Sequence, residues 1–210
     1  METSHQPRVI SEEVQKLLEK GAIQEVSENE DGFYSRLFLV PKKDGQMHPV
    51  INLRPLNQFL VQNQFLVQNH FKIEGMHVVK HLLQKNDWMT RIDLKDAYFS
   101  IPIDPQHQSF LRFKWQKRAY QFTYLPFGLS SAPRVFTKIL HPVVRFLRSK
   151  VTRCVIYLDD ILLLDQDRAK LIEHTAMTLS LLKALGFLVN YPKSELDPTQ
   201  KLIFLSFIIS

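Results

Sequence analysis

In four stretches of the chain, apolar residues recur every three or four positions, the spacing that places them on one face of a helix. The first stretch begins at Ser11, a candidate N-cap, and carries Val14, Leu17 and Leu18 before Gly21 ends it. The same spacing predicts three more helices: around 77–85, from Ser131 onward with a kink or an end at Pro142, and from about Arg168 to Leu185.

Between these helices the pattern is that of β-strands. The apolar run 36–40 ends at Pro41 and resumes over 49–53, which predicts a hairpin with Lys42 and Lys43 at a basic tip. Further strands are predicted over 97–103, in two stretches of 109–124 around a turn at 116–118, over 151–157 and 161–164, and over 201–210. Strands that alternate with helices and hairpins predict an α+β or α/β fold in which helices cover a sheet.

One hexapeptide, NQFLVQ, occurs twice in succession, at 57–62 and 63–68. Two short copies do not make a solenoid, so we interpret them as a small tandem duplication in the coding sequence. Six additional residues in a loop cost only a fraction of a kcal/mol in closure entropy, whereas in a strand they would lack partners. We therefore place the duplication in a loop between the hairpin and the next helix.

Composition narrows the class of protein. The 210 residues suffice for one large domain or two small lobes, and 45% hydrophobic with 23% charged residues excludes a wholly disordered chain. The single cysteine, Cys154, excludes an internal disulfide and a zinc site built on cysteine pairs. Apolar runs are far shorter than a membrane span, and the first residues lack the pattern of a signal peptide. We therefore expect an intracellular protein of the cytoplasm or nucleus, with no membrane partner.

The net charge of +6 leaves two interpretations open. Basic residues alternate with aromatic ones between 112 and 120, in the order Arg112, Phe113, Lys114, Trp115, Lys117, Arg118 and Tyr120. Cations among aromatic rings suit a phosphate backbone with stacked bases. The alternative is a pair of strands with solvated basic faces, which charge alone does not exclude.

An acidic pair, Asp159 and Asp160, separates two apolar runs at a predicted hairpin turn. Aspartate is common in turns, so the pair by itself indicates little more than a turn. Asp93, however, stands near the end of another apolar segment, and three carboxylates converge if these strands are neighbours. Such a cluster stays ionised only with cations bound. Ligands that are all oxygen suit Mg²⁺ or Mn²⁺, and two such ions form the arrangement for in-line phosphoryl transfer.

Six segments, in this order, carry a family resemblance: FLVPKKDG (38–45), PVINLRPLN (49–57), RIDLKDAYFSIPI (91–103), LPFGLSSAPRVF (125–136), YLDD (157–160) and KLIFLSF (201–207). With them the chain resembles the fingers and palm of a reverse transcriptase over roughly residues 8–210. It resembles most closely that of a tyrosine-recombinase (DIRS/Ngaro-type) retrotransposon, and it is also similar to retroviral and gypsy-like enzymes.

The resemblance implies an α+β right-hand polymerase fold, with an antiparallel palm sheet backed by helices. Its segments would be 1–35 as an N-terminal helix and lead-in, 36–90 as the fingers hairpin and connecting segment, and 91–210 as the palm. A fingers segment at 106–130 would interrupt the palm, which would end near the primer grip. A thumb, a connection region and a ribonuclease H domain are expected to be missing from this chain.

The resemblance also implies an RNA-directed DNA polymerase that adds deoxynucleoside triphosphates to a primer on an RNA or DNA template. Asp93, Asp159 and Asp160 would be the catalytic residues and would hold two Mg²⁺ ions, which Mn²⁺ can replace, with the Leu94 carbonyl as a further ligand. The ring of Tyr98 would exclude a ribose 2′-hydroxyl. Nucleotide binding would fall to Lys42, His48, Asp96, Ala97, Tyr98, Phe127, Gly128 and Lys193, and template binding to Arg54 and Asn57.

Three features depart from the family pattern: Met47-His48 in place of Trp-Arg, Ser206 in place of a glycine, and the NQFLVQ duplication. Histidine is mostly neutral at pH 7 and lacks the arginine fork. Losing such a charge-assisted contact would weaken nucleotide binding by about 1.5–3 kcal/mol. These departures favour one alternative, a catalytically inactive retrotransposon relic with residual nucleic-acid binding. A second alternative, an unrelated acidic metal-binding or structural protein, would require the motif matches to be accidental. The oligomeric state is not indicated.

Overall fold

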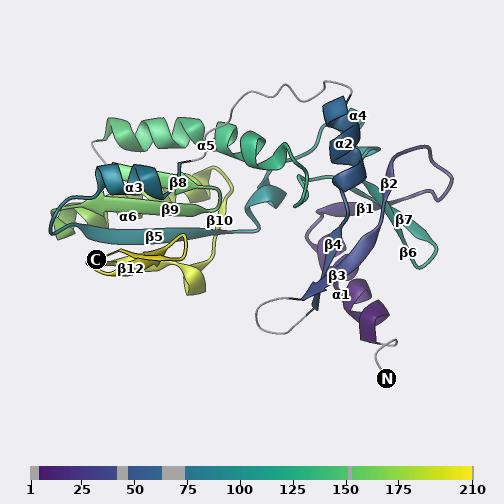
Figure 1. Ribbon diagram of the computed structural model, residues 1–210, viewed down its shortest axis with the longest axis horizontal. Helices are drawn as coiled ribbons and strands as arrows, with labels where there is room; N and C mark the ends of the chain where they lie inside the picture. Colours follow the sequence, from purple (N-terminus) through teal and green to yellow (C-terminus); the bar gives the residue numbers. More distant parts are fainter. Residues whose placement is uncertain (1–4, 42–46, 63–73, 151–152, 210) are drawn as a thin grey trace. The chain divides into compact units, whose positions relative to one another are not determined.

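Residues 5–41, 47–62, 74–150 and 153–209 are described by a computed structural model (Figure 1). Contacts within the chain divide it into two units. The first unit comprises Met1–Asn69 with Tyr98–Ala132, and the second comprises His70–Ala97 with Pro133–Ser210. Each unit has its own cluster of buried apolar side chains. The segments 1–35, 36–90 and 91–210, with the roles expected of them, stay a prediction.

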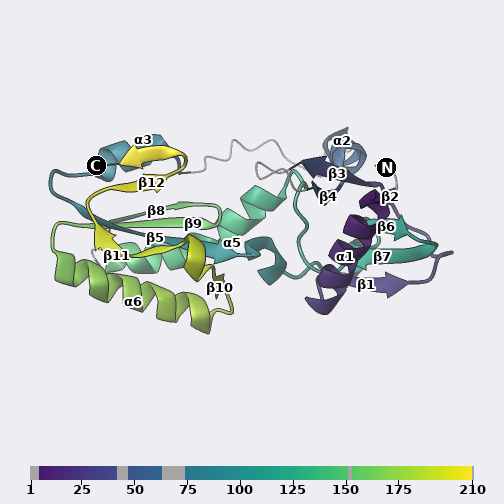
Figure 2. The ribbon, with the colours of Figure 1, turned by 90° about the horizontal axis from the view of Figure 1, so that it is seen from below.

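The first unit packs helix α1 (His5–Glu19) against a four-stranded sheet (Figures 1 and 2). The strand order is β1 (Ile23–Val26), β7 (Arg118–Phe122), β6 (Arg112–Trp115) and β2 (Tyr34–Ser35), with β2 parallel to β6 and the other pairs antiparallel. The apolar stripe of α1 is buried as expected, but Ser11 is not its N-cap, because the helix already begins at His5. The Ser11 hydroxyl instead donates to the Pro7 carbonyl one turn earlier, at 2.9 Å.

The predicted hairpin is confirmed. Strands β3 (Leu37–Pro41) and β4 (Met47–Ile51) pair antiparallel, from Leu37 opposite Ile51 to Pro41 opposite Met47. Its basic tip, including Lys42, lies outside the described residues.

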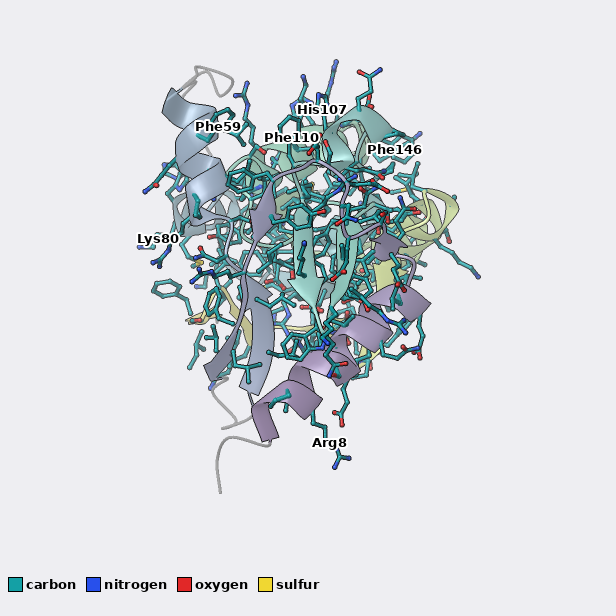
Figure 3. The ribbon with its side chains drawn as sticks, turned by 90° about the vertical axis from the view of Figure 1, so that its right-hand side faces the viewer. Arg8, Phe59, Lys80, His107, Phe110 and Phe146 are labelled. Carbon is teal, nitrogen blue, oxygen red and sulfur yellow. The ribbon has the colours of Figure 1, made fainter. Side chains whose placement is uncertain are left out.

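The loop assigned to the duplication is wrong for the first copy, which lies within helix α2 (Arg54–Gln62). Leu56 is buried and Leu60 packs against the same cluster, whereas Phe59 is 44% exposed (Figure 3). Leucines four positions apart therefore anchor one face of this helix to the first unit's core. The second copy lies outside the described residues.

In the basic and aromatic segment 112–120, Phe113 and Tyr120 are buried, so these two rings do not offer a surface for base stacking. The rings of Phe113 and Tyr120 stack on each other in the core, with centroids 5.3 Å apart. Arg112 is only 6% exposed, and its guanidinium pairs with Glu30 at 2.7 Å. The turn between β6 and β7 is as predicted, because Gln116 and Lys117 both have positive φ angles, as a tight hairpin turn requires.

The second unit is built on an antiparallel sheet. Its strand order is β10 (Leu188–Val189), β5 (Trp88–Lys95), β9 (Asp160–Asp165) and β8 (Arg153–Tyr157), and β11 (Glu195–Thr199) also pairs with β5. One face carries α3 (Met76–Leu82) and the β12–β13 hairpin, and the other carries α5 (Ala132–Ser149) and α6 (Arg168–Ala184) (Figure 2). Val79 of α3 packs with Met89 on the first face, and Thr175 of α6 bonds to Thr90 through their hydroxyls at 2.8 Å on the second.

The predicted helices near 77–85 and 168–185 are confirmed, and so are the strands on either side of Asp159. The helix expected from Ser131 is also present, and it continues through Pro142 to Ser149. The short strands β1, β2, β10 and β11 were not predicted.

Two of the predicted strands are wrong. The segment 97–103 contains the 3₁₀ helix η1 (Ala97–Ser100), because Asp96 adopts a φ of 50° that breaks the strand after Lys95. The segment 201–210 is not one strand but a hairpin of β12 (Leu202–Phe204) and β13 (Phe207–Ile209). It turns at Leu205 and Ser206, whose φ angles are 50° and 66°.

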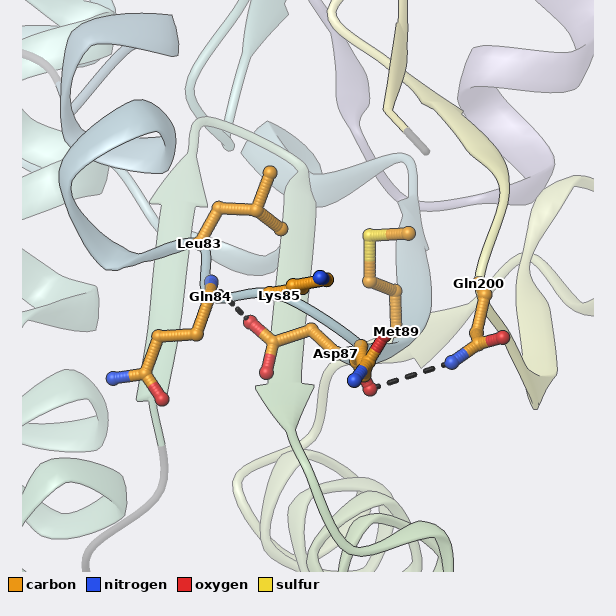
Figure 4. A pocket seen from close by; sticks show the side chains of 7 residues that line it. Leu83, Gln84, Lys85, Asp87, Met89 and Gln200 are labelled. Atoms are coloured by element: carbon orange, nitrogen blue, oxygen red, sulfur yellow. Dashed lines mark hydrogen bonds between the residues drawn. The ribbon is translucent and has the colours of Figure 1, made fainter.

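A hollow of about 390 Å³ lies beside the first residues of β5 (Figure 4). Asp87 accepts a hydrogen bond there from the Gln84 amide at 2.7 Å, and the Gln200 side chain donates to the Asn86 carbonyl at 3.3 Å. The hollow lies at the opposite end of β5 from Asp93.

No helix in the described part of the chain is both long enough and apolar enough to span a bilayer.

Candidate active site

The β8–β9 hairpin brings an acidic pair to one end of the second unit's sheet. Buried residues on both strands, among them Val155 and Leu162, hold the hairpin in the core. Leu158 takes a φ of 54° to reverse the chain, and Asp159 follows in the turn. Asp160 is the first residue of β9 and lies opposite Tyr157. The local sequence thus places both carboxylates where the buried strands end.

Strand β5 contributes the third carboxylate. Asp93 lies directly opposite Asp160 in the antiparallel register, so both side chains belong to the same face of the sheet. The Leu94 amide donates to the Asp159 carbonyl at 2.8 Å and links β5 to the turn. The condition set from the sequence, that these strands be neighbours, is therefore met.

Burial and mutual repulsion disfavour the ionised carboxylates. The pKa of Asp160 is raised to about 6, first by burial and then by the charge of Asp159, while Arg91 opposes the rise. Burial also raises the pKa of Asp159, with a smaller contribution from Asp93, and the charge of Lys193 opposes the rise at both residues. This end of the sheet is therefore a place where added positive charge is stabilising.

The short helix η2 (Tyr191–Lys193) and its flanking residues hold β5 beside the carboxylates. The Asn190 amide donates to the Asp93 carbonyl at 2.8 Å, and the Asp93 amide donates to the Ser194 hydroxyl at 3.0 Å. Lys193 is exposed. Neither Asn190 nor Ser194 was singled out from the sequence, because their contacts to Asp93 cross about 100 residues and no local pattern marks them.

The donors at this site fit a divalent cation by their chemistry. Carboxylate oxygens and backbone carbonyls are the ligands that Mg²⁺ and Mn²⁺ prefer, and burial raises the pKa of Asp159 and Asp160 although Lys193 opposes the rise at both. Within the described ranges, however, no three histidine, cysteine, aspartate or glutamate side chains are gathered as a ready-made ligand cage. Binding an ion would therefore require the carboxylate side chains to draw together.

In the first unit, the structure brings Tyr98 and Phe127 together. Their ring centroids are 4.8 Å apart and their planes are tilted by 44°. Tyr98 is 8% exposed, whereas Phe127 is 53% exposed and also meets the edge of Phe99. An aromatic side chain thus supports the Tyr98 ring from one side and remains largely open to solvent.

Asn57 has a structural role that its sequence position did not reveal. Its side-chain amide donates to the Gly128 carbonyl, and its carbonyl oxygen accepts from the Ser130 amide, both at 2.9 Å. Gly128 has a φ of 92°, which a side chain would disfavour. Asn57 therefore anchors the loop that begins at Phe127, while Arg54 is exposed at the start of α2.

The remaining predicted residues divide between described and undescribed parts. Asp96 closes β5, and Ala97 is buried in η1. His48 lies opposite Val40 in the β3–β4 register, and its side chain is outside the described part of the structure. Lys42 is outside it entirely.

The chain matches the protein family described as reverse transcriptase (RNA-dependent DNA polymerase) over residues 40–209. Among curated relatives, the Tf2-3 and Tf2-7 transposon polyproteins of Schizosaccharomyces pombe are 26% and 25% identical to it over 167 residues. The matched region is 78% of this chain but only 12% of each polyprotein.

Solved structures agree on the fold. The foamy viral protease–reverse transcriptase in complex with double-stranded DNA superposes with a TM-score of 0.82 at 21% identity, over 99% of this chain and 41% of that one. The same enzyme in complex with an RNA/DNA hybrid gives 0.78 at 21% identity, over 100% and 26%. The expected α+β polymerase fold is thus confirmed. The chain belongs to the reverse transcriptase (RNA-dependent DNA polymerase) family.

Proposed function

We propose that this chain is the part of an RNA-directed DNA polymerase that carries the catalytic carboxylates. It would add deoxynucleotides from their triphosphates to a primer 3′-hydroxyl on an RNA or DNA template. The observation that carries the proposal is the register of Asp93 opposite Asp160, with Asp159 in the adjoining turn, in a chain of this family. The foamy viral protease–reverse transcriptase was solved in complex with double-stranded DNA and with an RNA/DNA hybrid, which supports a nucleic-acid partner for this chain too.

Reverse transcriptases use divalent metal ions. We assign Asp93, Asp159 and Asp160, with the Leu94 carbonyl, to hold two Mg²⁺ ions. When bound, such ions lower the pKa of the attacking hydroxyl and neutralise the triphosphate. The carboxylates would orient the primer end, and Lys193 would place positive charge beside them.

Further roles follow the resemblance. Tyr98 would exclude a ribose 2′-hydroxyl, supported by its buried ring and its contact with Phe127. Phe127 and Gly128 would border the nucleotide. The hydrogen bond from Asn57 to Gly128 holds the loop that contains them in one conformation. The other residues carried over are Lys42, His48, Asp96 and Ala97 for the nucleotide, and Arg54 and Asn57 for the template.

We also infer that the parent element is a tyrosine-recombinase retrotransposon of the DIRS/Ngaro type. The support is the amino-acid sequence of the six motifs, of which RIDLKDAYFSIPI and LPFGLSSAPRVF are the longest. Sequencing the genomic DNA that flanks this coding segment tests the inference. A tyrosine-recombinase gene in the same element is expected, and an integrase gene instead would contradict it.

Primer extension on poly(rA)/oligo(dT) with Mg²⁺ or Mn²⁺ tests the activity directly. Incorporation of dTTP is expected, and Asp159→Asn should abolish it. Asp165→Asn is the matched control, because Asp165 lies at the other end of β9, opposite Trp88. It should retain incorporation. Equal loss in both variants would show that a fold defect, not the carboxylate cluster, limits the assay.

The rival function is that of an inactive relic that binds nucleic acid weakly. Ser206 favours it, because a residue with a side chain occupies a φ of 66° where the family usually has glycine. A folded chain that binds poly(rA)/oligo(dT) but incorporates no dTTP with either metal would establish the relic.

A further inference from the structure

Arg91 joins three segments of the second unit. It lies on β5, two residues before Asp93. One terminal nitrogen of its guanidinium donates to the Lys193 carbonyl at 2.6 Å, and the other donates to the Ile203 carbonyl at 2.8 Å. These contacts tie η2 and β12 to the middle of the sheet across more than 100 residues.

Side chains of β5 point alternately to the two faces of the sheet, and this alternation places the Arg91 contacts near the active site. Residues two apart on a strand share a face, so Arg91 lies between Met89 and Asp93 on the face that also carries α3 and β12. Its neighbour across the register, Leu162, is buried. A long cationic side chain thus crosses the border between the apolar cluster and the carboxylates.

Stability does not explain this arginine. Its Nε is buried and has no hydrogen-bond partner among the described residues, which is a cost to folding. The two hydrogen bonds that it does make go to the exposed residues Lys193 and Ile203 and not to the core. A methionine at this position would extend the apolar cluster that contains Met89 and Leu162.

We propose that Arg91 is a positioning residue that acts through Lys193. By holding the Lys193 carbonyl, its guanidinium fixes η2 and so directs the Lys193 ammonium toward the carboxylates. Two further contacts, from Asn190 and Ser194 to the backbone of Asp93, place the same segment beside the site. The guanidinium is suited to this role because its planar fork presents two separate nitrogens to the two carbonyls, whereas an ammonium has one nitrogen on a flexible stem. The catalytic consequence rests on the proposed polymerase function.

Hydrogen exchange tests the anchor without any activity. The Lys193 and Ser194 amides both donate to the Asn190 carbonyl, so their exchange reports the order of η2. We expect Arg91→Met and Arg91→Lys to speed exchange at these amides about tenfold, with the melting temperature nearly unchanged in Arg91→Met. Arg153→Lys is the matched control, because Arg153 pairs with Asp87 at the other end of the sheet. It should leave these amides unaffected. Unchanged exchange in both Arg91 variants would overturn the anchor.

Primer extension with dTTP tests the catalytic consequence through a double-mutant cycle. Arg91→Met should raise the KM for dTTP about five- to tenfold in the native background. Its effect should be clearly smaller in Lys193→Ala, because residues that act through one contact are not additive, and what remains is the direct effect of the Arg91 charge on Asp160. An equal effect in both backgrounds would overturn the link to Lys193. If the native chain incorporated no dTTP, the polymerase function would fail, while hydrogen exchange would still decide the anchor.

Discussion

The environment of Asp160 changes the chemistry of its carboxyl group. Its pKa is raised to about 6 from 3.8, so between these values the folded chain binds a proton that the unfolded chain releases. Without metal, the free energy of unfolding should therefore fall as pH rises from about 4 to 6, by roughly 1–2 kcal/mol. Asp160→Asn should remove most of this slope, leaving the contribution of Asp159, and be the more stable form at pH 7. Urea unfolding in EDTA at several pH values measures both.

Metal ions should offset the loss of stability that the ionised Asp160 carboxylate causes. Above pH 6, Mn²⁺ should raise the melting temperature of the native chain and have a smaller effect on Asp160→Asn, because a bound ligand stabilises only the form that binds it. If the variant kept both the pH slope and the full Mn²⁺ response, another group would be responsible for them.

Tyr98 offers a test of sugar selection. Tyr98→Val removes the ring that rests on Phe127, so ribonucleotides should enter more readily and the ratio of dTTP to UTP incorporation should fall. Steric discrimination of this kind rests on a few kcal/mol, so the change should be measurable. Tyr98→Phe keeps the ring and should keep the ratio. An unchanged ratio in an active Tyr98→Val chain would reduce Tyr98 to a packing residue.

Ser206 carries a backbone penalty that the sequence could only suggest. Its φ of 66° is in the left-handed region, which costs a residue with a side chain about 1 kcal/mol. Ser206→Gly should therefore raise the free energy of unfolding by about 0.5–1 kcal/mol in urea denaturation. Ser180→Gly, on the exposed side of α6, should lower it by a similar amount. A loss of stability in Ser206→Gly would show that the backbone of Ser206 is not strained.

At the scale of elements, the duplication can be tested by deletion. Removing either copy of NQFLVQ leaves the same sequence, in which the remaining copy completes α2. The chain should therefore unfold within about 1 kcal/mol of the native form, because shortening a connection changes closure entropy only slightly. Thermal unfolding measures this. A fall of more than about 5 °C would mean that the second copy has a structural role of its own.

Element prediction succeeded where local signals agreed. Helix α6 has the predicted glycine after its end and buries one stripe, made of Leu171, Thr175, Thr178 and Leu182, and it runs from Arg168 to Ala184. Element prediction failed where one backbone angle decided whether a strand continued. Asp96 converts an alternating run into η1, and the Leu205–Ser206 turn divides an apolar run into β12 and β13. Sequence alternation does not reveal a positive φ at a residue other than glycine.

At the scale of the whole molecule, the net charge of +6 predicts how nucleic acid should bind. Affinity for an RNA/DNA primer–template should fall about tenfold or more between 50 and 200 mM salt, because bound cations are released from the phosphates. Fluorescence anisotropy with labelled oligo(dT) on poly(rA) measures this. Salt-independent binding would argue against contacts to the phosphate backbone.

By itself, the sequence predicted the family and most helices, left the fold between α+β and α/β, and singled out the three carboxylates. It did so because the motifs are local strings and because helical and strand spacing reflect burial on one face. The conditional inference that Asp93 meets Asp159 and Asp160 was also available, since each stands where an apolar run ends.

Only the tertiary structure decided the register and the supports of the site. Asp93 lies opposite Asp160 because β5 and β9 pair in one of several registers that the sequence permits. Arg91, Asn190 and Ser194 reach the site through contacts that cross about 100 residues, and Asn57 holds the Gly128 loop across 71. Such contacts depend on how buried faces pack together, and packing is a property of the folded chain that no local pattern encodes.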